Sequence, residues 1–440
     1  MTGTGHCMRA HVAWAFAACA LAAHAADADL DPAFGDGHQV TQVRPVEFGN
    51  GQAWVGDVAT LPDGHIAWAM ENGLGALWIA RMRRDGTFDP AFAGDGLLEL
   101  DDCVGPRPVR IAPLDDGSLV AWTGRCLQRI TADGTLDPAF PAAPGGPGPD
   151  FIAARLLRDA AGRWLLAGND GQELRVYRFL PEGAPDPAFG DDGVATIITA
   201  STNGTRTLAA MALRADGRIV LAGSRGNSHG PNLVVASLDA SGAPDAAFGV
   251  QGIVDLDPPA GYNGIAARAI AVDRDGSLVV AGEGNNGMQS CCVLVARIGA
   301  DGTVDPGALR IFPLGPNVTL SAFGETSNTL ALLPHGKILL ARVSFPFEIA
   351  TRTRFTLVRM HHDGSLDLGF NDVGWRSYVV ADPEGQGQSG PYSQIHGMAW
   401  ANGEALMFGR TFFEDNAIGP DYVTLMRARM DMLFEDGYEP

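Results

Sequence analysis

The feature that most constrains how this chain can fold is a short phrase that recurs along almost its whole length. The phrase reads Asp-Pro-Ala-Phe at 31–34, 89–92, 137–140 and 186–189, and altered forms of it begin at Asp245, Asp305, Asp367 and Asp431. Successive aspartates lie 48 to 64 residues apart, which is too long for one coil of a solenoid. Each interval must therefore hold a module of several strands, copied along the chain.

Each interval predicts a β-hairpin followed by a third strand. The hairpin is marked by a turn of the Asp-Gly type and an apolar run ending in Ala-Gly, as in 213–223, because Asp-Gly supplies the positive backbone angles of tight turns. Runs such as 218–222 and 232–236 lack the alternation of a half-exposed sheet, so both faces of these strands must be covered. Short antiparallel sheets, covered on both faces and repeated around seven modules, describe an all-β fold, a single β-propeller.

The order of the strands predicts how the ring closes. Most modules gain a fourth strand after the recurring phrase, as in 193–197 and 252–256. The chain begins with such a fourth strand, near 38–44, and ends after a third one, near 423–429, so the N-terminal strand would complete the last blade and remove an exposed sheet edge. In the second module a proline-rich run, 141–149, replaces the fourth strand, which leaves three regular strands because proline cannot donate to a central ladder.

The recurring phrase has a structural interpretation of its own. Asp caps the turn through its carboxylate, Pro fixes one backbone angle, and Phe offers a large apolar plug to the gap between blades. The sharper alternative is a catalytic or calcium-binding role, suggested by acidic turns such as 190–193. A calcium loop needs five or more clustered oxygen ligands, which these turns do not show, so the structural interpretation is favoured and no metal is expected.

Three longer phrases carry a family resemblance. Asp-Gly-Thr-Leu-Asp-Pro-Ala-Phe (133–140), Phe-Gly-Asp-Asp-Gly (189–193) and Leu-Arg-Ala-Asp-Gly-Arg-Ile-Val-Leu-Ala-Gly (213–223) resemble the delta-60 repeat, which is found in bacterial exported proteins and is regarded as propeller-like. The resemblance covers nearly the whole mature chain. It implies a fold but no activity, because the family carries no agreed catalytic residues to transfer.

Residues 1–25 have the pattern of a secretory signal peptide. Arg9 gives the positive flank, 12–23 carries no charge, and Ala23-His24-Ala25 is a small-x-small cleavage site. The expected organisation is a signal peptide at 1–25, a propeller at 26–430, and a C-terminal tail or decayed repeat at 431–440. The protein would be secreted, periplasmic or located at the cell surface, without membrane insertion after signal removal; a lipid anchor at Cys19 is the alternative.

The formal net charge of -20 limits the partners of the protein. Such a surface repels phosphate backbones and anionic lipid, which argues against nucleic acid and membrane-surface partners. The excess of acid also keeps an exported protein soluble. We expect a monomer without a cofactor, whose partner is an unidentified protein or glycan.

Four cysteines remain after the signal peptide, and an exported protein with an even number of cysteines invites disulfides. Cys103 follows one expected strand and Cys126 lies in the next module, so a bond between them could staple neighbouring modules. Cys291 and Cys292 are adjacent and would point to opposite faces of a strand, so they are either two buried thiols or a pair joined through a distorted backbone. No ligand spacing typical of zinc occurs.

The candidate site is the central channel, which the innermost strand of each module lines. The residues four before the recurring Leu, Val or Trp of each hairpin are Asp57, Arg110, Ala153, Ala209, Arg268, Thr329 and His396. Five of them are polar, which suggests that this set faces channel water. Arg110 and Arg268 would bind an anionic or sugar ligand, with Asp57 and His396 as hydrogen-bonding or acid/base groups. The alternative is a wet channel whose polar residues only satisfy one another.

The composition of one loop and the absence of local catalytic motifs complete the functional expectations. The run 283–288 has the composition of a recognition loop. No Gly-rich phosphate loop and no Gly-x-Ser-x-Gly elbow occur, although propeller enzymes assemble their sites from separate blades.

The sequence favours an exported, non-enzymatic propeller that binds a protein, a glycan or a cell-surface component. The alternative is a channel-site enzyme, a hydrolase or lyase acting on glycans through carboxylates from different blades.

Overall fold

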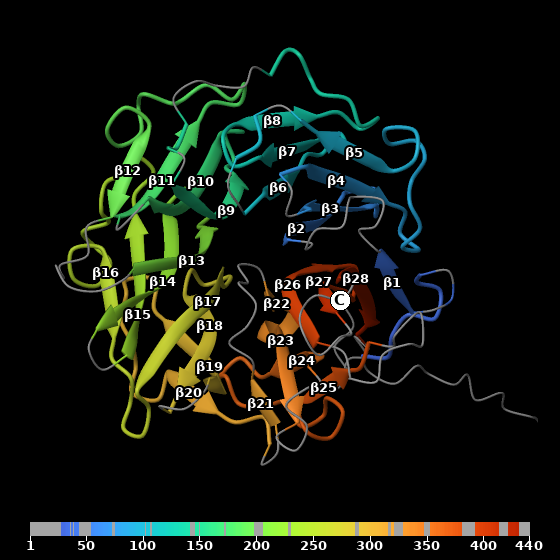
Figure 1. Cartoon of the computed structure of the whole chain (residues 1–440). Helices are drawn as coiled ribbons and strands as arrows, with labels where there is room; N and C mark the ends of the chain where they lie inside the picture. Colours follow the sequence, from blue (N-terminus) through green and yellow to red (C-terminus); the bar gives the residue numbers. More distant parts are fainter. Residues whose placement is uncertain are drawn as a thin grey trace, which may run out of the picture.

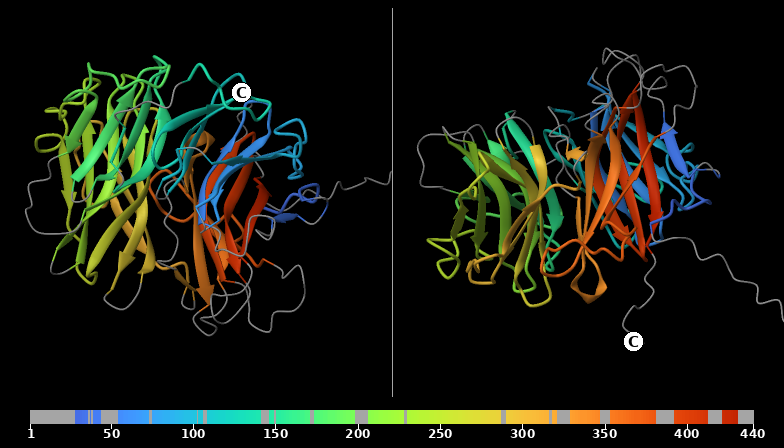
Figure 2. Two further views of the ribbon diagram at one scale, coloured as in Figure 1. Left: turned by 45° about the horizontal axis from the view of Figure 1, so that its top comes forward. Right: turned by 90° about the horizontal axis from the view of Figure 1, so that it is seen from below.

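Seven antiparallel sheets surround a common centre in this computed structural model (Figure 1). The structure describes residues 28–35, 37, 39–43, 54–72, 75–101, 103–105, 108–140, 146–148, 150–170, 173–197, 206–227, 230–286, 290–315, 318–320, 329–346, 353–380, 392–412 and 421–430. Seen from the side, the strands run along the axis of the ring (Figure 2). The all-β, seven-bladed propeller predicted from the sequence is confirmed. The predicted signal peptide, 1–25, and tail, 431–440, lie outside the described residues.

Six of the seven sheets, numbered here as blades in chain order, are built from consecutive strands. Blade 1 contains β2 (Trp54–Thr60), β3 (Ile66–Glu71), β4 (Leu77–Met82) and β5 (Leu97–Leu100). Blade 2 contains β6 (Arg110–Pro113), β7 (Leu119–Trp122) and β8 (Leu127–Ile130). Blade 3 contains β9 (Phe151–Arg158), β10 (Trp164–Asp170), β11 (Glu173–Phe179) and β12 (Val194–Ile197). Blade 4 contains β13 (Arg206–Leu213), β14 (Ile219–Asn227), β15 (Gly230–Leu238) and β16 (Ile253–Leu256).

Of the remaining three blades, blade 5 has the same four-strand order, whereas blades 6 and 7 depart from it. Blade 5 contains β17 (Gly264–Val272), β18 (Leu278–Asn285), β19 (Ser290–Ile298) and β20 (Leu309–Phe312). Blade 6 contains β21 (Val318–Leu320), β22 (Leu330–Leu332), β23 (Ile338–Pro346), β24 (Arg354–Met360) and β25 (Trp375–Tyr378), with a 3-10 turn at Pro334–Gly336. Blade 7 contains β26 (Tyr392–Ala401), β27 (Glu404–Phe412), β28 (Asp421–Arg429) and, from the other end of the chain, β1 (Val40–Val43). Blade 2 has three strands in its described part, as the prolines at 141–149 predict.

The two faces of the ring differ in sequence. Every innermost strand begins at one face, here called the loop face, and ends in an Asp-Gly type hairpin turn at the other, here called the motif face. The described Asp-Pro-Ala-Phe phrases also lie at the motif face: those of blades 1 to 6 follow a third strand that ends there, and the one at 31–34 lies beside the end of β28. The repeated sequences therefore build one face, and the connections of variable length build the other.

The N-terminal segment closes the ring, as predicted. Strand β1 pairs antiparallel with β28, and Leu30 forms a bridge with Ala428. Asp31, which is fully buried, accepts a hydrogen bond of 2.8 Å from Arg427 Nε and also contacts Arg429. The edge of the last blade is thereby covered by a strand from the start of the chain.

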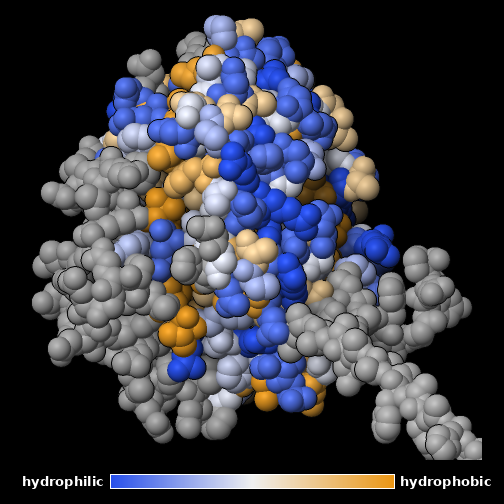
Figure 3. Space-filling view, turned by 90° about the vertical axis from the view of Figure 1, so that its right-hand side faces the viewer, coloured by the Kyte–Doolittle hydropathy of each residue, from blue (hydrophilic) through white to orange (hydrophobic). Residues whose placement is uncertain are grey.

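The apolar core is divided among the blade junctions. Each of the seven clusters of buried apolar side chains is drawn from two adjacent blades, including one shared by blades 7 and 1 and another shared by blades 6 and 7. No blade can therefore bury its own faces without both neighbours. Around β1 and β5 the outer surface is mainly hydrophilic, with scattered apolar residues (Figure 3).

The Asp-Pro-Ala-Phe phrase works as a clamp between blades. In blade 3, Asp186 Oδ1 accepts a hydrogen bond of 3.0 Å from Ala188 N, which caps the turn, and its Oδ2 lies 2.7 Å from Arg178 Nε. Arg178 also donates to Ala240 O in blade 4 and stacks over Phe189, which is buried in the junction between these two blades. The predicted cap and plug are both confirmed here, and the arginine that ends the third strand is an additional partner.

Candidate functional site

A β-bulge interrupts the innermost strand of five blades at one common level. The register shifts in β2, β9, β13, β17 and β26, and the unpaired residues are Gly56, Ala154, Ala209, Arg268 and His396. Bulges re-aim side chains and often lie near binding sites. Arg268 and His396, two of the sequence-predicted site residues, are therefore directed by an irregularity of the strand.

The bulge explains the glycine that lies inside the second strand of blades 3, 4, 5 and 7. A Cβ at Gly282 would collide with the carbonyl oxygen of Ala266 in the bulged strand, and one at Gly223 would collide with that of Thr207. Only glycine leaves room for these carbonyl groups. The glycine therefore marks in the sequence where the neighbouring strand is bulged.

Asp57 and Arg110 do not face channel water, contrary to the expectation from the sequence. Asp57 is 1% exposed and Arg110 is 6% exposed. Asp57 is the residue after the bulge of β2, a position that returns the side chain to the region between blades. There it accepts a hydrogen bond of 3.4 Å from Ile111 N of blade 2 and lies 3.6 Å from Arg155 Nη1 of blade 3.

Arg110 joins three blades through main-chain oxygens. Its Nε donates to Ala154 O of blade 3 at 2.8 Å, and its Nη1 donates to Gly56 O of blade 1 at 2.9 Å. Both acceptors are bulge residues. The guanidinium satisfies carbonyl groups that a regular ladder would have paired, which is the structural role considered as the alternative for this channel.

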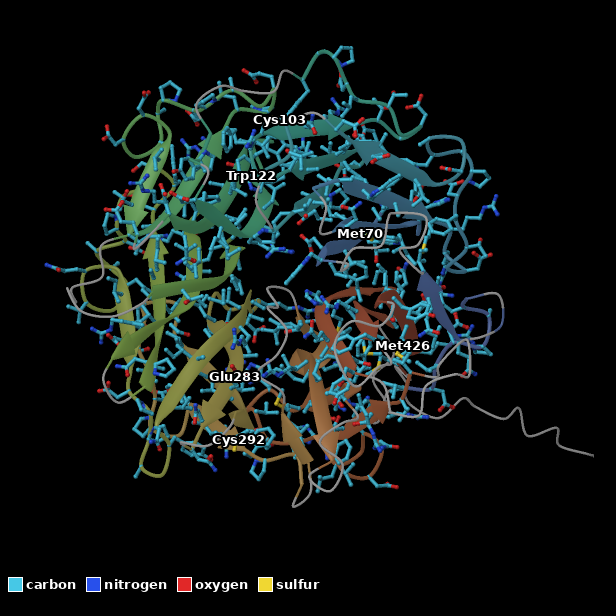
Figure 4. The ribbon with its side chains drawn as sticks, in the orientation of Figure 1. Met70, Cys103, Trp122, Glu283, Cys292 and Met426 are labelled. Carbon is cyan, nitrogen blue, oxygen red and sulfur yellow. A yellow bond between two sulfur atoms is a disulfide. The ribbon has the colours of Figure 1, made fainter. Side chains whose placement is uncertain are left out.

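Arg268 belongs to an ion cluster at the junction of blades 5 and 6. Its Nε donates to Glu283 Oε1 at 3.1 Å, and Arg342 Nη2 of β23 donates to Glu283 Oε2 at 2.8 Å. Burial raises the pKa of Glu283, but the charges of Arg342 and Arg268 outweigh it and hold that pKa below its usual value. Glu283 is 5% exposed and lies in β18, not in the recognition loop expected at 283–288. Figure 4 shows it closer to the centre of the ring than Cys292.

His396 is the fourth predicted residue, and its environment is cationic. Its side chain is partly exposed, whereas its Nε2 is buried and has no hydrogen-bond partner among the described residues. Burial, together with the charges of Arg410 and Arg110, lowers the pKa of His396 to about 3. The imidazole is therefore neutral at physiological pH. The four predicted residues thus lie in three places: Asp57 and Arg110 between blades, Arg268 with Glu283, and His396 in blade 7.

Sequence reasoning missed the polar residue that follows each Ala-Gly. Asn169, Glu283 and Arg410 occupy this position on the second strand and are largely buried. Each one reaches the following blade: Asn169 Oδ1 accepts a hydrogen bond of 2.9 Å from Leu208 N. The signal is visible in the sequence, because Gly-Asn, Gly-Ser, Gly-Glu and Gly-Arg follow Ala or Phe where an apolar strand would be expected to continue.

Aromatic side chains gather around Arg410 at the loop face. The guanidinium carbon of Arg410 lies 5.6 Å from the ring centre of Trp54 in blade 1 and 5.1 Å from that of Phe412, which is within the range of cation–π attraction. Tyr392 stacks on Phe412 with ring centres 5.1 Å apart and planes 9° apart. Trp54 is 39% exposed although it is a large apolar residue. These four residues are called the Trp54 cluster below.

Cys103 and Cys126 form a disulfide at the loop face, between the connection from blade 1 to blade 2 and a hairpin turn of blade 2. Their Cα atoms lie 6.0 Å apart. Cys292 in β19 is also disulfide-bonded, so it is not a free thiol. Among the described residues there is no group of three or more His, Cys, Asp or Glu that could hold a metal ion, and no helix there is both long and apolar enough to cross a membrane.

Comparisons with known structures return matches of low similarity. A protein from Lactobacillus plantarum is 15% identical, with a TM-score of 0.41, over 74% of this chain and 83% of its own. A protein of unknown function from Dyadobacter fermentans is 12% identical, with a TM-score of 0.39, over 89% of this chain and 100% of its own. Prolyl oligopeptidase B from Galerina marginata is 10% identical, with a TM-score of 0.38, over 84% of this chain and 47% of its own.

Sequence comparison finds similarity in the repeating unit. No curated protein matches the chain. Residues 214–248 and 274–307 match a family described as "Domain of unknown function (DUF5122) beta-propeller". Each match runs from the hairpin turn through the second and third strands to the Asp-Pro-Ala-Phe phrase or its variant, in blades 4 and 5. The repeat of this chain is thus similar to that of a β-propeller family whose function is unknown.

Proposed function

We propose that this chain is an exported, non-enzymatic β-propeller that binds a glycan at its loop face. The single observation that carries the proposal is the Trp54 cluster. Its indole is exposed, and the guanidinium of Arg410 lies near both this indole and the stacked rings of Tyr392 and Phe412. Flat apolar rings beside charged hydrogen-bond donors match sugar rings, which present a face of C–H groups edged by hydroxyls.

The charge balance of the channel supports binding over catalysis. A glycan hydrolase needs a carboxyl group whose pKa is raised, so that it can donate a proton near neutral pH. Two arginines hold the pKa of Glu283 below its usual value instead, and Asp57 faces Arg155. These carboxylates serve blade-to-blade contacts. The disulfide between Cys103 and Cys126 supports export, because such bonds persist in oxidising compartments.

The first prediction concerns Trp54. The mature protein should bind at least one member of a polysaccharide panel, and Trp54→Ala should weaken that binding by about tenfold or more, because an aromatic anchor at a binding site is typically worth more than 1 kcal/mol. Isothermal titration calorimetry measures the affinity. Trp54→Phe, which keeps a ring, should retain most of it.

A matched control is Leu368→Ala, since Leu368 is also an exposed apolar residue but belongs to a recurring phrase of the motif face. This variant should bind like the parent protein. Equal affinity of the Trp54→Ala and parent proteins would refute the proposed surface. Release of shorter sugars from a bound polysaccharide, followed by a reducing-end assay, would instead support the enzymatic alternative.

A further inference from the structure

The ion cluster of Arg268, Glu283 and Arg342 has more positive than negative charge. Two guanidinium groups share one carboxylate, which leaves a local charge of one positive unit. Arg342 is 4% exposed, and the charged groups that shift its pKa, within the described part of the chain, are Glu283 and Arg268. A buried charge without a counter-charge is costly, and the cost falls when an anion binds.

Both arginines keep donors that the cluster does not use. A guanidinium has five N–H donors. Arg342 places Nη2 on Glu283, while its Nε is buried and has no partner among the described residues. Arg268 places Nε and Nη2 on the same carboxylate. The unused donors of two guanidinium groups beside one carboxylate are suited to a second carboxylate or a sulfate, which such groups bind in a bidentate manner.

The local backbone makes room for this arrangement. Arg342 lies on β23, at the position that is glycine in the second strand of blades 3, 4, 5 and 7. Both β21 and β22 pair with β23, and Arg342 lies opposite the interval between them. Arg268 is the bulged residue of β17, and its side chain is 23% exposed. The cluster is therefore buried on the side of blade 6 and open to solvent on the side of Arg268.

We propose that Arg268 and Arg342 form a binding site for a carboxylate or sulfate group, with Glu283 holding the two guanidinium groups in place. The protein as a whole carries a net charge of -20, which repels small anions. A locally cationic site is therefore where a small anion is bound with the most favourable electrostatic energy. The group can belong to a free small anion or to an acidic sugar. This site does not depend on the Trp54 cluster, and each can fail without the other.

The test measures anion binding to the mature protein at constant ionic strength, with sodium sulfate and sodium acetate as probes and calorimetry and thermal unfolding as readouts. The parent protein should bind sulfate or acetate and unfold at a higher temperature in its presence. Arg342→Met leaves a neutral pair of Arg268 and Glu283, so it should fold and lose at least tenfold in anion affinity. Glu283→Gln removes the competing carboxylate and should bind the anion several-fold more tightly.

Arg225→Met is the matched control, because Arg225 pairs with one carboxylate, Asp255, and is exposed to a similar extent as Arg268. It should keep the affinity of the parent protein. If Arg342→Met fails to fold, Arg268→Gln gives the same test from the solvent side. Unchanged anion affinity in the Arg268 or Arg342 variant, or no binding of either probe by the parent, would overturn the proposal. A galacturonate oligomer that binds more tightly than acetate would identify an acidic sugar as the source.

Discussion

At the scale of single residues, His396 is a neutral imidazole held beside two arginines. Its pKa of about 3 lies below the unfolded value of about 6.5, so between these values the unfolded chain binds the extra proton. Stability is therefore complete above pH 6.5 and falls as the pH decreases toward 3. The contribution of one such group is at most about 1.4 kcal/mol per pH unit.

His396→Gln tests this behaviour, because glutamine keeps a polar side chain and does not titrate. Denaturant unfolding between pH 6.5 and 5.5, above the range where most carboxyl groups titrate, should show a smaller loss of stability in the variant than in the parent. If the free energy of unfolding falls equally with pH in the two proteins, His396 does not govern the pH dependence of stability in this range. The comparison requires no ligand.

The residue scale also shows where reasoning from the sequence stopped. Counting back from the hairpin correctly found the inner strands, but it placed Asp57 in water because it assumed a regular alternation of side chains. It also placed Arg110 in water, whereas that guanidinium binds main-chain oxygens of two other blades. A bulge adds one residue, and one residue reverses which way every later side chain points. Glycines face the bulges of blades 4 and 5, but Ala69 and Met70 face the bulge of β2, so nothing in that hairpin of the sequence marked it.

At the scale of elements, Asp31 is a buried anchor of the N-terminal segment. Burial raises the pKa of this carboxyl, but the hydrogen bond from Ala33 and the charges of Arg427 and Arg429 outweigh it, so that the pKa is lowered. Asp31→Asn should destabilise the protein by about 3 kcal/mol, as expected for breaking a buried ion pair. It should also speed hydrogen exchange of the amides in β28, whose outer partner is β1.

Asp89→Asn is the matched control at the element scale. Asp89 holds the same position in its phrase, and its carboxylate lies 3.2 Å from Arg81 Nε. Asp89 and Arg81 are close together in the sequence, whereas Asp31 and Arg427 are far apart in it. This change should lower stability and leave the exchange of β28 no faster than in the rest of the ring. Slow exchange of β28 in the Asp31 variant would show that other contacts hold the segment.

Element order could be predicted well, while element irregularities could not. Repetition predicted the blade count, the closing strand and the short second blade. The same strand pattern recurs in every module, so a strand that is ambiguous in one module can be assigned by comparison with the others. The extra inner strand of blade 6 has no copy in the other blades as far as they are described, and therefore nothing to be compared with. The proposed anion site lies at this unique place, where Arg342 replaces a glycine.

At the scale of the whole molecule, stability depends on seven junctions. Phe248 is fully buried between blades 4 and 5. Phe248→Ala should cost about 3 to 5 kcal/mol, the usual range for removing a buried aromatic ring. Because neighbouring blades share their cores, the variant should still unfold in one transition that tryptophan fluorescence and circular dichroism report at the same denaturant concentration.

The exposed residue Val250, two positions later, provides the control for this junction. Val250→Ala should change stability by no more than about 0.5 kcal/mol. Separate transitions for the two probes in the Phe248 variant would mean that the blades unfold independently, in disagreement with the shared cores.

The closing strand has a consequence for the order of events in time. Residues 40–43 are made long before their partners, 423–426. A chain that crosses a membrane in the direction of its synthesis would therefore carry β1 unpaired until these partners have also crossed, and the ring could close only then. The last blade would thus be the last part of the ring to fold.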